Sequence, residues 1–271
     1  MPAPVISASA LTKKYKDFAA VDGISFEVAP GESFGLLGPN GAGKSTTMRM
    51  VGAVSTRSSG NLSILGLDPD HYGPEIRAQL GVVPQTDNLD NELRVRDNLI
   101  VYGRYFGMPH ARALINDPSI LLLDEPTTGL DPQARHILWD RLFRLKEQGT
   151  TLVLTTHYMD EAEQLCDRLI VVDKGKIMAE GAPAALIREH SSKEVLEVRF
   201  GSELNEGMAG KLVGIGDRLE VLPDRILIYS RDGEAELDRI TRAGHRPMTS
   251  LVRRSSLEDV FLRLTGRSLV E

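Results

Sequence analysis

Short apolar runs alternate with helical patterns from the start of the chain to about residue 190. Compact runs rich in Val, Ile and Leu predict strands at residues 5–15, 24–28, 33–37, 61–65, 81–83, 120–123, 151–155, 169–172 and 177–180. Apolar positions at helical spacing predict helices at residues 44–53, 95–106, 133–147 and 159–166. Strands that alternate with helices indicate an α/β fold with a parallel sheet and crossover helices.

The pattern changes after about residue 190. Beyond this point the sequence predicts strands at residues 195–200, 218–221 and 225–230, and helices at residues 234–243 and 257–264. These elements indicate a small α+β appendage without a concentration of catalytic residue types. We therefore expect two domains, residues 1–190 and residues 191–271.

Composition narrows the class of protein. The 271 residues include 32 Lys and Arg against 38 Asp and Glu, and the net charge of −6 argues against a globally basic nucleic-acid binder. The single cysteine, Cys166, has no partner for an internal disulfide, which fits a reducing compartment. No apolar run approaches the ~20 residues of a membrane-spanning helix, and the first residues lack a secretory-signal pattern. We therefore expect a cytoplasmic protein whose contact with a membrane depends on a partner chain.

Glycines dominate the loop after the strand predicted at residues 33–37. Residues 38–46 read Gly-Pro-Asn-Gly-Ala-Gly-Lys-Ser-Thr and match the phosphate-binding pattern GxxxxGK[ST] between a strand and a helix. Such glycines let backbone N–H groups surround a phosphate at the helix N-terminus. We expect Lys44 to reach the β- and γ-phosphates and Ser45 to bind Mg²⁺ through its hydroxyl. The remaining residues expected to contact nucleotide in this loop are Gly38, Pro39, Asn40, Gly41, Ala42, Gly43 and Thr46.

Two adjacent acids follow the apolar run at residues 120–123. Asp124 at the strand end is placed to hold the Mg²⁺ shell, and Glu125 to polarise a water that attacks the γ-phosphate. For this stretch alone, a buried strand that ends in an acidic turn is the simpler interpretation. The phosphate-binding loop upstream and the sequence Thr-Thr-Gly-Leu-Asp at residues 127–131 favour the catalytic interpretation.

In this order the motifs resemble those of nucleotide-binding subunits of ATP-binding-cassette (ABC) transporters, which bind ATP and Mg²⁺. The resemblance implies a P-loop NTPase with a RecA-like parallel sheet core, an N-terminal antiparallel β subdomain and a helical subdomain. Tyr15 matches the aromatic residue on which adenine stacks, Gln85 the residue that senses metal and water, and His157 the switch histidine at the γ-phosphate. The resemblance therefore assigns catalysis to Glu125, His157, Lys44 and Gln85, and Mg²⁺ binding to Ser45, Gln85 and Asp124.

Further stretches resemble exporter ATPases of the nodulation-factor and drug-resistance type, at residues 87–90, 102–108, 111–118, 165–168 and 257–266. This resemblance covers nearly the whole chain. It implies a separate integral-membrane permease, a homo- or heterodimer of cassettes, and a location on the inner face of the cell membrane, with no nucleic-acid partner. Export of a lipo-chitooligosaccharide is implied by the nodulation-factor subgroup alone.

One motif of the family is missing. The family carries a signature of the LSGGQ type shortly before the segment that matches residues 111–114, and this chain has no Ser-Gly-Gly sequence. Residues 108–110 run directly into that segment, so the sequence predicts that most of the helical subdomain is deleted near residues 108–111. In the family, the signature of one subunit faces the phosphate-binding loop of the other, and its loss removes charge stabilisation of the γ-phosphate.

Two functions therefore remain open. The first is an ATP-driven export subunit, which is favoured by the intact Glu125 and His157. The second is a nucleotide-binding protein with little turnover, regulatory or vestigial, which is favoured by the missing signature. A truncated reading frame of an ordinary exporter ATPase would leave the same gap. A P-loop kinase for small molecules is disfavoured, because it needs neither the pair of acids nor a switch histidine.

Overall fold

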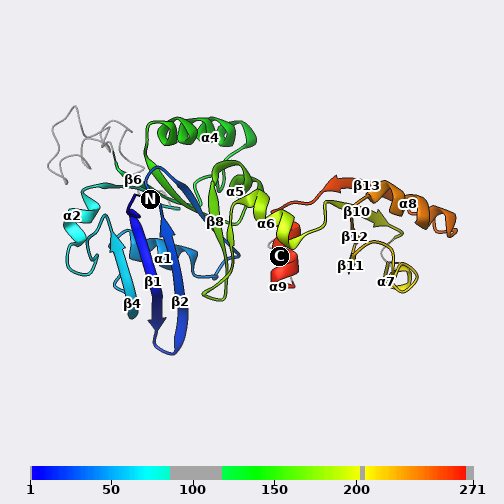
Figure 1. The fold of residues 1–271 in the computed structure, drawn as a ribbon, viewed down its shortest axis with the longest axis horizontal. Helices are drawn as coiled ribbons and strands as arrows, with labels where there is room; N and C mark the ends of the chain where they lie inside the picture. Colours follow the sequence, from blue (N-terminus) through cyan, green and yellow to red (C-terminus); the bar gives the residue numbers. More distant parts are fainter. Residues whose placement is uncertain (1, 86–117, 202–204, 267–271) are drawn as a thin grey trace, which may run out of the picture. The chain divides into compact units, whose positions relative to one another are not determined.

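The computed structural model describes residues 2–85, 118–201 and 205–266, which belong to two compact units, Met1–Ala182 and Pro183–Glu271 (Figure 1). The division falls at the beginning of α6 (Pro183–His190), whereas the sequence analysis placed its boundary at the end of that helix. Helix α6 packs against α9 (Leu257–Thr265), and this contact assigns it to the second unit.

A six-stranded sheet forms the centre of the first unit. Its strands lie in the order β5 (Leu80–Val83), β6 (Ile120–Asp124), β7 (Thr151–Thr156), β3 (Ser33–Leu37), β8 (Arg168–Asp173) and β9 (Lys176–Gly181). The first five are parallel, and β9 returns antiparallel to β8. Every residue of β3 and β7 is buried, as expected for central parallel strands covered on both faces. The predicted α/β class with a parallel core is confirmed.

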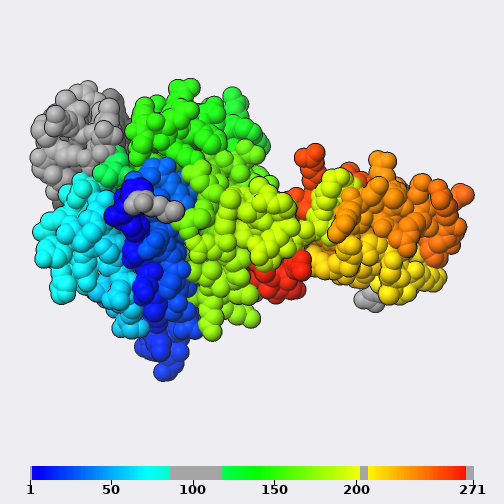
Figure 2. All heavy atoms as spheres, in the orientation of Figure 1, coloured from blue at the N-terminus to red at the C-terminus, as the bar shows by residue number. Residues whose placement is uncertain are grey.

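A three-stranded antiparallel sheet, in the order β2-β1-β4, accompanies this core. Its strands are β1 (Ile6–Tyr15), β2 (Phe18–Val28) and β4 (Ser59–Ile64). The blue and cyan strands lie side by side in the ribbon and cover neighbouring parts of one face in the space-filling view (Figures 1 and 2). Their buried side chains join those of β3 and β6 in one hydrophobic cluster. The antiparallel β subdomain implied by the resemblance is thus present.

The described helices of the first unit are α1 (Lys44–Val51), α2 (Gly73–Arg77), α4 (Pro132–Glu147) and α5 (Met159–Leu165). Helix α4 begins at an N-cap residue, Asp131, whose carboxylate accepts a hydrogen bond from Ala134 N at 2.8 Å. Pro132 follows at the first helical position, where its missing N–H costs nothing. In the part of the chain that the structure describes, no helix is long and apolar enough to cross a membrane.

The second unit contains an antiparallel sheet in the order β11-β12-β10-β13. Its elements are α6, β10 (Glu194–Arg199), α7 (Asn205–Ala209), β11 (Arg218–Val221), β12 (Ile226–Ser230), α8 (Gly233–Arg242), β13 (Thr249–Arg254) and α9. Alternate residues of β10 enter two different hydrophobic clusters, so both faces of this sheet bury apolar side chains. The predicted α+β appendage is confirmed.

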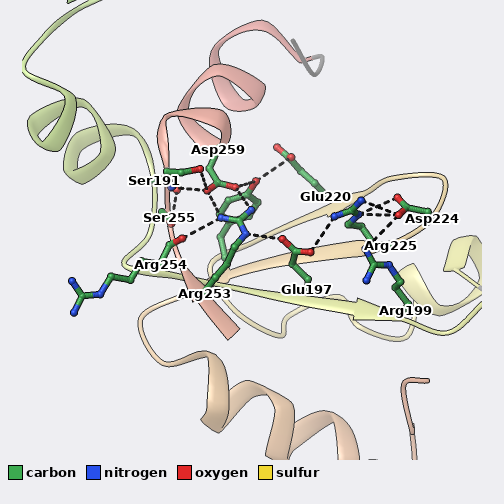
Figure 3. A network of polar contacts seen from close by, with 12 residues as sticks. Ser191, Glu197, Arg199, Glu220, Asp224, Arg225, Arg253, Arg254, Ser255 and Asp259 are labelled. Atoms are coloured by element: carbon green, nitrogen blue, oxygen red, sulfur yellow. Dashed lines mark hydrogen bonds and ion pairs between the residues drawn. The ribbon is translucent and has the colours of Figure 1, made fainter. Parts of the chain in front are cut away.

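A network of charged side chains in the second unit joins α9 to the sheet (Figure 3). Arg253 of β13 donates to both carboxylate oxygens of Asp259, at 2.7 and 2.9 Å, and to Glu197 Oε1 at 2.6 Å. The opposite oxygen of Glu197 accepts from Arg225 at 3.2 Å. Asp259 also accepts from Tyr229 OH at 3.1 Å and caps α9 through Ser256 N at 2.8 Å. The network therefore fixes the first turn of α9 against three strands.

Several elements differ from their sequence predictions. Strand β2 begins at Phe18 instead of residue 24, and four elements were not predicted: α2, α6, α7 and β13. The strands predicted at residues 169–172 and 177–180 form a hairpin, with Asp173 paired to Lys176. The helix predicted at residues 95–106 and the deletion predicted near residues 108–111 lie outside the described residues.

Candidate functional site

The candidate site lies where β3, β6 and β7 end, at their carboxyl ends. These three strands are neighbours in the sheet, and their final residues are in register: Leu37 pairs with Thr156, and Asp124 with Thr155. The loops that follow parallel neighbours emerge at the same edge. The phosphate-binding loop, the pair of acids and His157 are therefore brought together, as the sequence predicts.

The loop at residues 38–43 fits against its surroundings only with glycines at two positions. A Cβ atom on Gly38 would lie 2.2 Å from Val172 O, and one on Gly43 would lie 2.4 Å from Ala20 O. Gly43 also has a φ of 104°, a conformation that side-chain-bearing residues rarely adopt. The loop thus reaches the N-terminus of α1 in one tightly defined path, with that helix end directed toward the site.

Lys44 carries the positive charge of the loop. Its side chain is 4% exposed, and its Nζ donates to Gly38 O at 2.7 Å and to Pro39 O at 3.1 Å. The same atom lies 3.4 Å from Glu125 Oε1. Burial lowers the pKa of Lys44, although the negative charge of Glu125 opposes this effect. The ammonium is therefore held by two carbonyl oxygens, which phosphate oxygens could replace, and by the carboxylate of Glu125.

Three oxygen-bearing side chains form a second cluster beside the lysine. Ser45 Oγ donates to Asp124 Oδ1 at 3.2 Å, and Thr155 Oγ1 donates to the same carboxylate oxygen. Among the described residues, no three His, Cys, Asp or Glu side chains are grouped as metal ligands. One carboxylate and one hydroxyl nevertheless suit Mg²⁺, which completes its shell with waters and substrate phosphates. The donor set therefore fits this ion in the presence of a phosphate-bearing ligand.

Glu125 is the centre of a third cluster. Its Oε2 accepts from Gln85 Nε2 at 3.0 Å and from Thr128 Oγ1 at 3.4 Å, and lies 3.1 Å from His157 Nδ1. Its side chain is 5% exposed, and its φ is 50°, which is uncommon for a residue with a side chain. Such strain is typical of residues whose position matters for function.

An open cavity of 450 Å³ lies in front of these groups. Its lining includes Lys44, Ser45, Gln85 and Glu125, together with Tyr15 and Phe18 from the β1–β2 hairpin. Tyr15 is 47% exposed and Phe18 is 63% exposed, so both rings are available to a planar ligand. Phe18 was not among the predicted site residues, because no motif marks it. It pairs with Tyr15 across the hairpin turn and so lies beside it.

The other loop residues occupy different positions around the cavity. Asn40, Gly41, Gly43 and Thr46 line it, Gly38 and Pro39 contribute carbonyls to Lys44, and Ala42 is buried. The site residues predicted from the sequence thus lie at or directly behind one cavity. The role of each toward a ligand remains a prediction.

Three known families match parts of this chain. Residues 21–110 match the ABC transporter family, residues 206–266 match the C-terminal domain of the nodulation factor export protein NodI, and residues 104–159 match an AAA domain family. The Nod factor export ATP-binding protein I of Paraburkholderia xenovorans is 41% identical, over 99% of this chain and 99% of its own. The chain belongs to the ABC transporter ATP-binding family. It is an ABC-type ATPase of the kind coupled to transport.

Other relatives extend this family match. The Nod factor export ATP-binding protein I of Rhizobium etli is 44% identical, over 97% of this chain and 94% of its own. The alignment with the Paraburkholderia relative spans 306 positions, more than the 271 residues of this chain. This ABC ATPase therefore lacks positions that its relative has.

Solved structures support the fold. An ATP-binding subunit of an ABC transporter superposes with a TM-score of 0.61 at 25% identity, over 68% of this chain and 92% of its own. The ATP-binding cassette MJ0796, solved as a dimer with ADP and phosphate, gives a TM-score of 0.57 at 24% identity, over 65% of this chain and 98% of its own. The P-loop cassette fold is thereby confirmed.

Proposed function

We propose that this chain is the ATP-binding and hydrolysing subunit of an exporter, and that it drives a separate membrane permease for lipo-chitooligosaccharides. The observation that carries the proposal is the meeting of Lys44, Asp124, Glu125 and His157 at one end of the sheet. The names of the relatives and the match of the second unit to the NodI C-terminal domain support the substrate class. Attachment to the inner membrane face would be through the permease, and the working form would be a dimer of cassettes.

Nucleotide binding follows from the cavity and its charges. The adenine ring would stack on Tyr15, and the exposed ring of Phe18 offers a second apolar surface beside it. The phosphates would lie on the loop at the N-terminus of α1, where backbone N–H groups and the helix dipole favour negative charge. Lys44 Nζ would exchange its carbonyl partners for oxygens of the β- and γ-phosphates, which are stronger acceptors.

Mg²⁺ would be held by Ser45 Oγ and Asp124 Oδ1, and Gln85, which lines the same cavity, would be the third ligand. When bound, this ion neutralises charge that develops on the phosphate oxygens. Asp124 keeps its orientation through the hydrogen bond from Thr155. The residues that bind the ion are thus positioned before it arrives.

Glu125 would act on the attacking water. Its carboxylate is held by Gln85 and Thr128 beside Lys44, and a water in the cavity that Gln85 and Lys44 line would donate a proton to it. His157 lies next to Oε2 of Glu125 and would contact the γ-phosphate. The two side chains together would make the site sensitive to the presence of a third phosphate.

The test of this function is complementation. The chain is expressed in a Rhizobium strain that lacks its own Nod factor export ATP-binding protein I, and secreted lipo-chitooligosaccharides are measured. We expect restored secretion with the native chain and none with Lys44→Ala. Restored secretion by both the native chain and Lys44→Ala would mean that export does not depend on this nucleotide site, and it would refute the proposal.

A second function is favoured by one observation, the absence of a Ser-Gly-Gly sequence. Without the signature the chain would bind Mg-ATP but turn it over very slowly, and it would act as a regulatory partner of an intact cassette. In that case the complementation fails, while ATP binding remains dependent on Lys44. The two functions are therefore separated by measuring secretion and binding on the same preparations.

A further inference from the structure

A carboxylate that the proposed mechanism does not use lies buried behind the site. Glu161 of α5 is 0% exposed. Its carboxyl group is surrounded by four side chains, Thr127 after β6, Thr156 at the end of β7, and Arg135 and Trp139 of α4. We call these five residues the Glu161 cluster. It joins two helices to the two strand ends that carry Glu125 and His157.

The polar atoms of the Glu161 cluster complement one another, yet they stop short of bonding. Within the described part of the chain, both oxygens of Glu161 are buried without a hydrogen-bond partner, and so are Thr127 Oγ1, Trp139 Nε1 and Arg135 Nε. The first two are acceptors and the last three are donors. Buried polar groups are almost always paired in folded proteins. A matched set left open therefore indicates a cluster that closes through a small movement.

The surroundings of the carboxyl group act on its pKa in opposite directions. Burial raises the pKa of Glu161, and the neighbouring groups of Thr156, Thr127 and Trp139 and the charge of Arg135 oppose that rise only in part. Thr156 Oγ1 accepts a hydrogen bond from Tyr158 N at 2.9 Å. Its own proton can go to Tyr158 O, but at 3.5 Å this hydrogen bond is long and weak. Glu161 is the stronger acceptor beside it.

The Glu161 cluster is linked to the site through very short stretches of backbone. Thr127 lies two residues after Glu125, and Thr156 directly precedes His157. These are the two segments whose side chains meet at Glu125 Oε2. A shift of either segment of a few tenths of an ångström would alter the contact between Glu125 and His157.

We propose that Glu161 is a positioning residue, which binds Thr127 and Thr156 together behind the site and thereby holds Glu125 and His157 toward the third phosphate of ATP. This role rests on the proposed function. It acts only on groups that face the γ-phosphate, because the loop around Lys44 that holds the other phosphates is not part of the cluster.

The test compares ATP with ADP. Dissociation constants for fluorescent analogues of both nucleotides are measured with Mg²⁺ for the native chain, Glu161→Gln and Thr127→Val. The amide keeps the size of Glu161 but turns an NH₂ toward donors, and valine keeps the shape of threonine without its hydroxyl. We expect the preference for ATP over ADP to fall about tenfold in each, as for one lost hydrogen bond in a buried site. ADP affinity should stay unchanged, and the double variant should lose no more than either single one.

Glu163→Gln is the matched control, since Glu163 is on the same helix and only partly buried. We expect it to behave like the native chain. An unchanged ATP preference in Thr127→Val and Glu161→Gln, or equal losses of ATP and ADP affinity in both, would overturn the positioning role. If Glu161→Gln alone also loses affinity for ADP, this variant has not folded correctly, and the ATP preference of Thr127→Val then tests the proposal. A native chain that binds neither nucleotide would instead refute the proposed function.

Discussion

Lys44 and Glu125 are in contact and buried, but they act at different steps of the proposed reaction. The lysine compensates phosphate charge in the bound state, and the glutamate acts when the water attacks. Their separation of 3.4 Å means that each is the other's counter-charge before nucleotide arrives. Substitution of Lys44 should therefore weaken ATP binding, whereas substitution of Glu125 should lower the rate of hydrolysis.

Removal of the lysine should abolish useful binding. Lys44→Ala takes away the main cation that faces the phosphates and leaves Glu125 buried without its partner. We expect the dissociation constant for Mg-ATP in equilibrium dialysis to rise by about a hundredfold or more. Lys193→Ala, a surface change in the second unit, is the control and should bind normally. Equal affinity in native chain and Lys44→Ala would mean that the site is wrongly assigned.

The two adjacent acids should respond differently to neutralisation. Glu125→Gln keeps the hydrogen bonds around the side chain but removes the base, so it should retain bound ATP and lose whatever turnover the native chain has. Asp124→Asn weakens the oxygen that Ser45 contacts, so it should mainly raise the Mg²⁺ concentration needed for binding. Paired binding and turnover assays check both. The reverse pattern would exchange the two roles.

At the scale of elements, the chemistry-bearing strands were predictable because they are short, apolar and followed by motifs. Strands β3 and β7 are buried along their whole length and β6 along most of it, so each contains a run of apolar residues, and their ends are marked by Gly38, Asp124 and His157. The meeting of Glu125 with Lys44 and His157 was implied by the family resemblance alone, because it depends on strand order within the sheet, which the motifs do not give.

The missed elements have physical reasons. Strand β2 contains a register shift beside Gly23, whose φ of 67° interrupts the alternation of buried and exposed positions. Strand β13 is at the edge of its sheet, and the exposed side chains of its first half give no period of two. Asp131 was noted only as part of a motif, and the structure shows that it is also the N-cap residue of α4.

The charge network of the second unit predicts a pH dependence. Burial acts to raise the pKa of Asp259, but hydrogen bonds from Arg253 and Ser256 outweigh it and hold that pKa below its ordinary value of 3.8. A carboxyl with a lower pKa in the folded state stabilises the fold fully above its unfolded pKa and loses this contribution as the pH falls through the folded one. The second unit should therefore weaken only below about pH 4.

Hydrogen exchange of α9 and β12 measures this dependence. We expect Asp259→Asn to reduce protection at pH 7 by about 1.5–3 kcal/mol, because Arg253 loses the carboxylate of Asp259 and keeps only Glu197 as an ion-pair partner. The acid-induced loss seen in the native chain should be smaller in this variant. Fluorescence of Trp139, the single tryptophan, reports the first unit and should not change. Asp224→Asn, at the exposed end of the network, should have little effect.

For the whole molecule, the missing signature limits turnover. We expect the chain alone to hydrolyse ATP very slowly and to form no productive ATP-bound homodimer, because neither composite site would receive donors from the opposite subunit. A loss of about 4 kcal/mol of transition-state stabilisation slows the chemical step nearly a thousandfold. An intact cassette as partner should rescue the one site that its own signature faces.

The measurement compares this chain with a version in which a family-type helical subdomain is inserted between residues 108 and 111. ATPase rate and ATP-dependent dimerisation, the latter by light scattering, should both rise in the extended version. The same insertion with Glu125→Gln serves as the control and should dimerise without turnover. Equal and rapid hydrolysis by the native and extended chains would show that the signature is dispensable here.

Because β5 and β6 are neighbours in the sheet, the segment that connects them can change in length without disturbing the sheet. The two strands pair in parallel from Leu80 with Ile120 to Val83 with Leu123. The segment between them leaves β5 after Val83 and enters β6 at Ile120, so the sheet fixes its two ends at opposite ends of the strand pair, about 11 Å apart. Chain entropy then makes the length of that segment cheap to change, since each doubling costs only about 0.6 kcal/mol. Evolution could therefore remove or restore a whole subdomain at this point and leave the ATP site as it is.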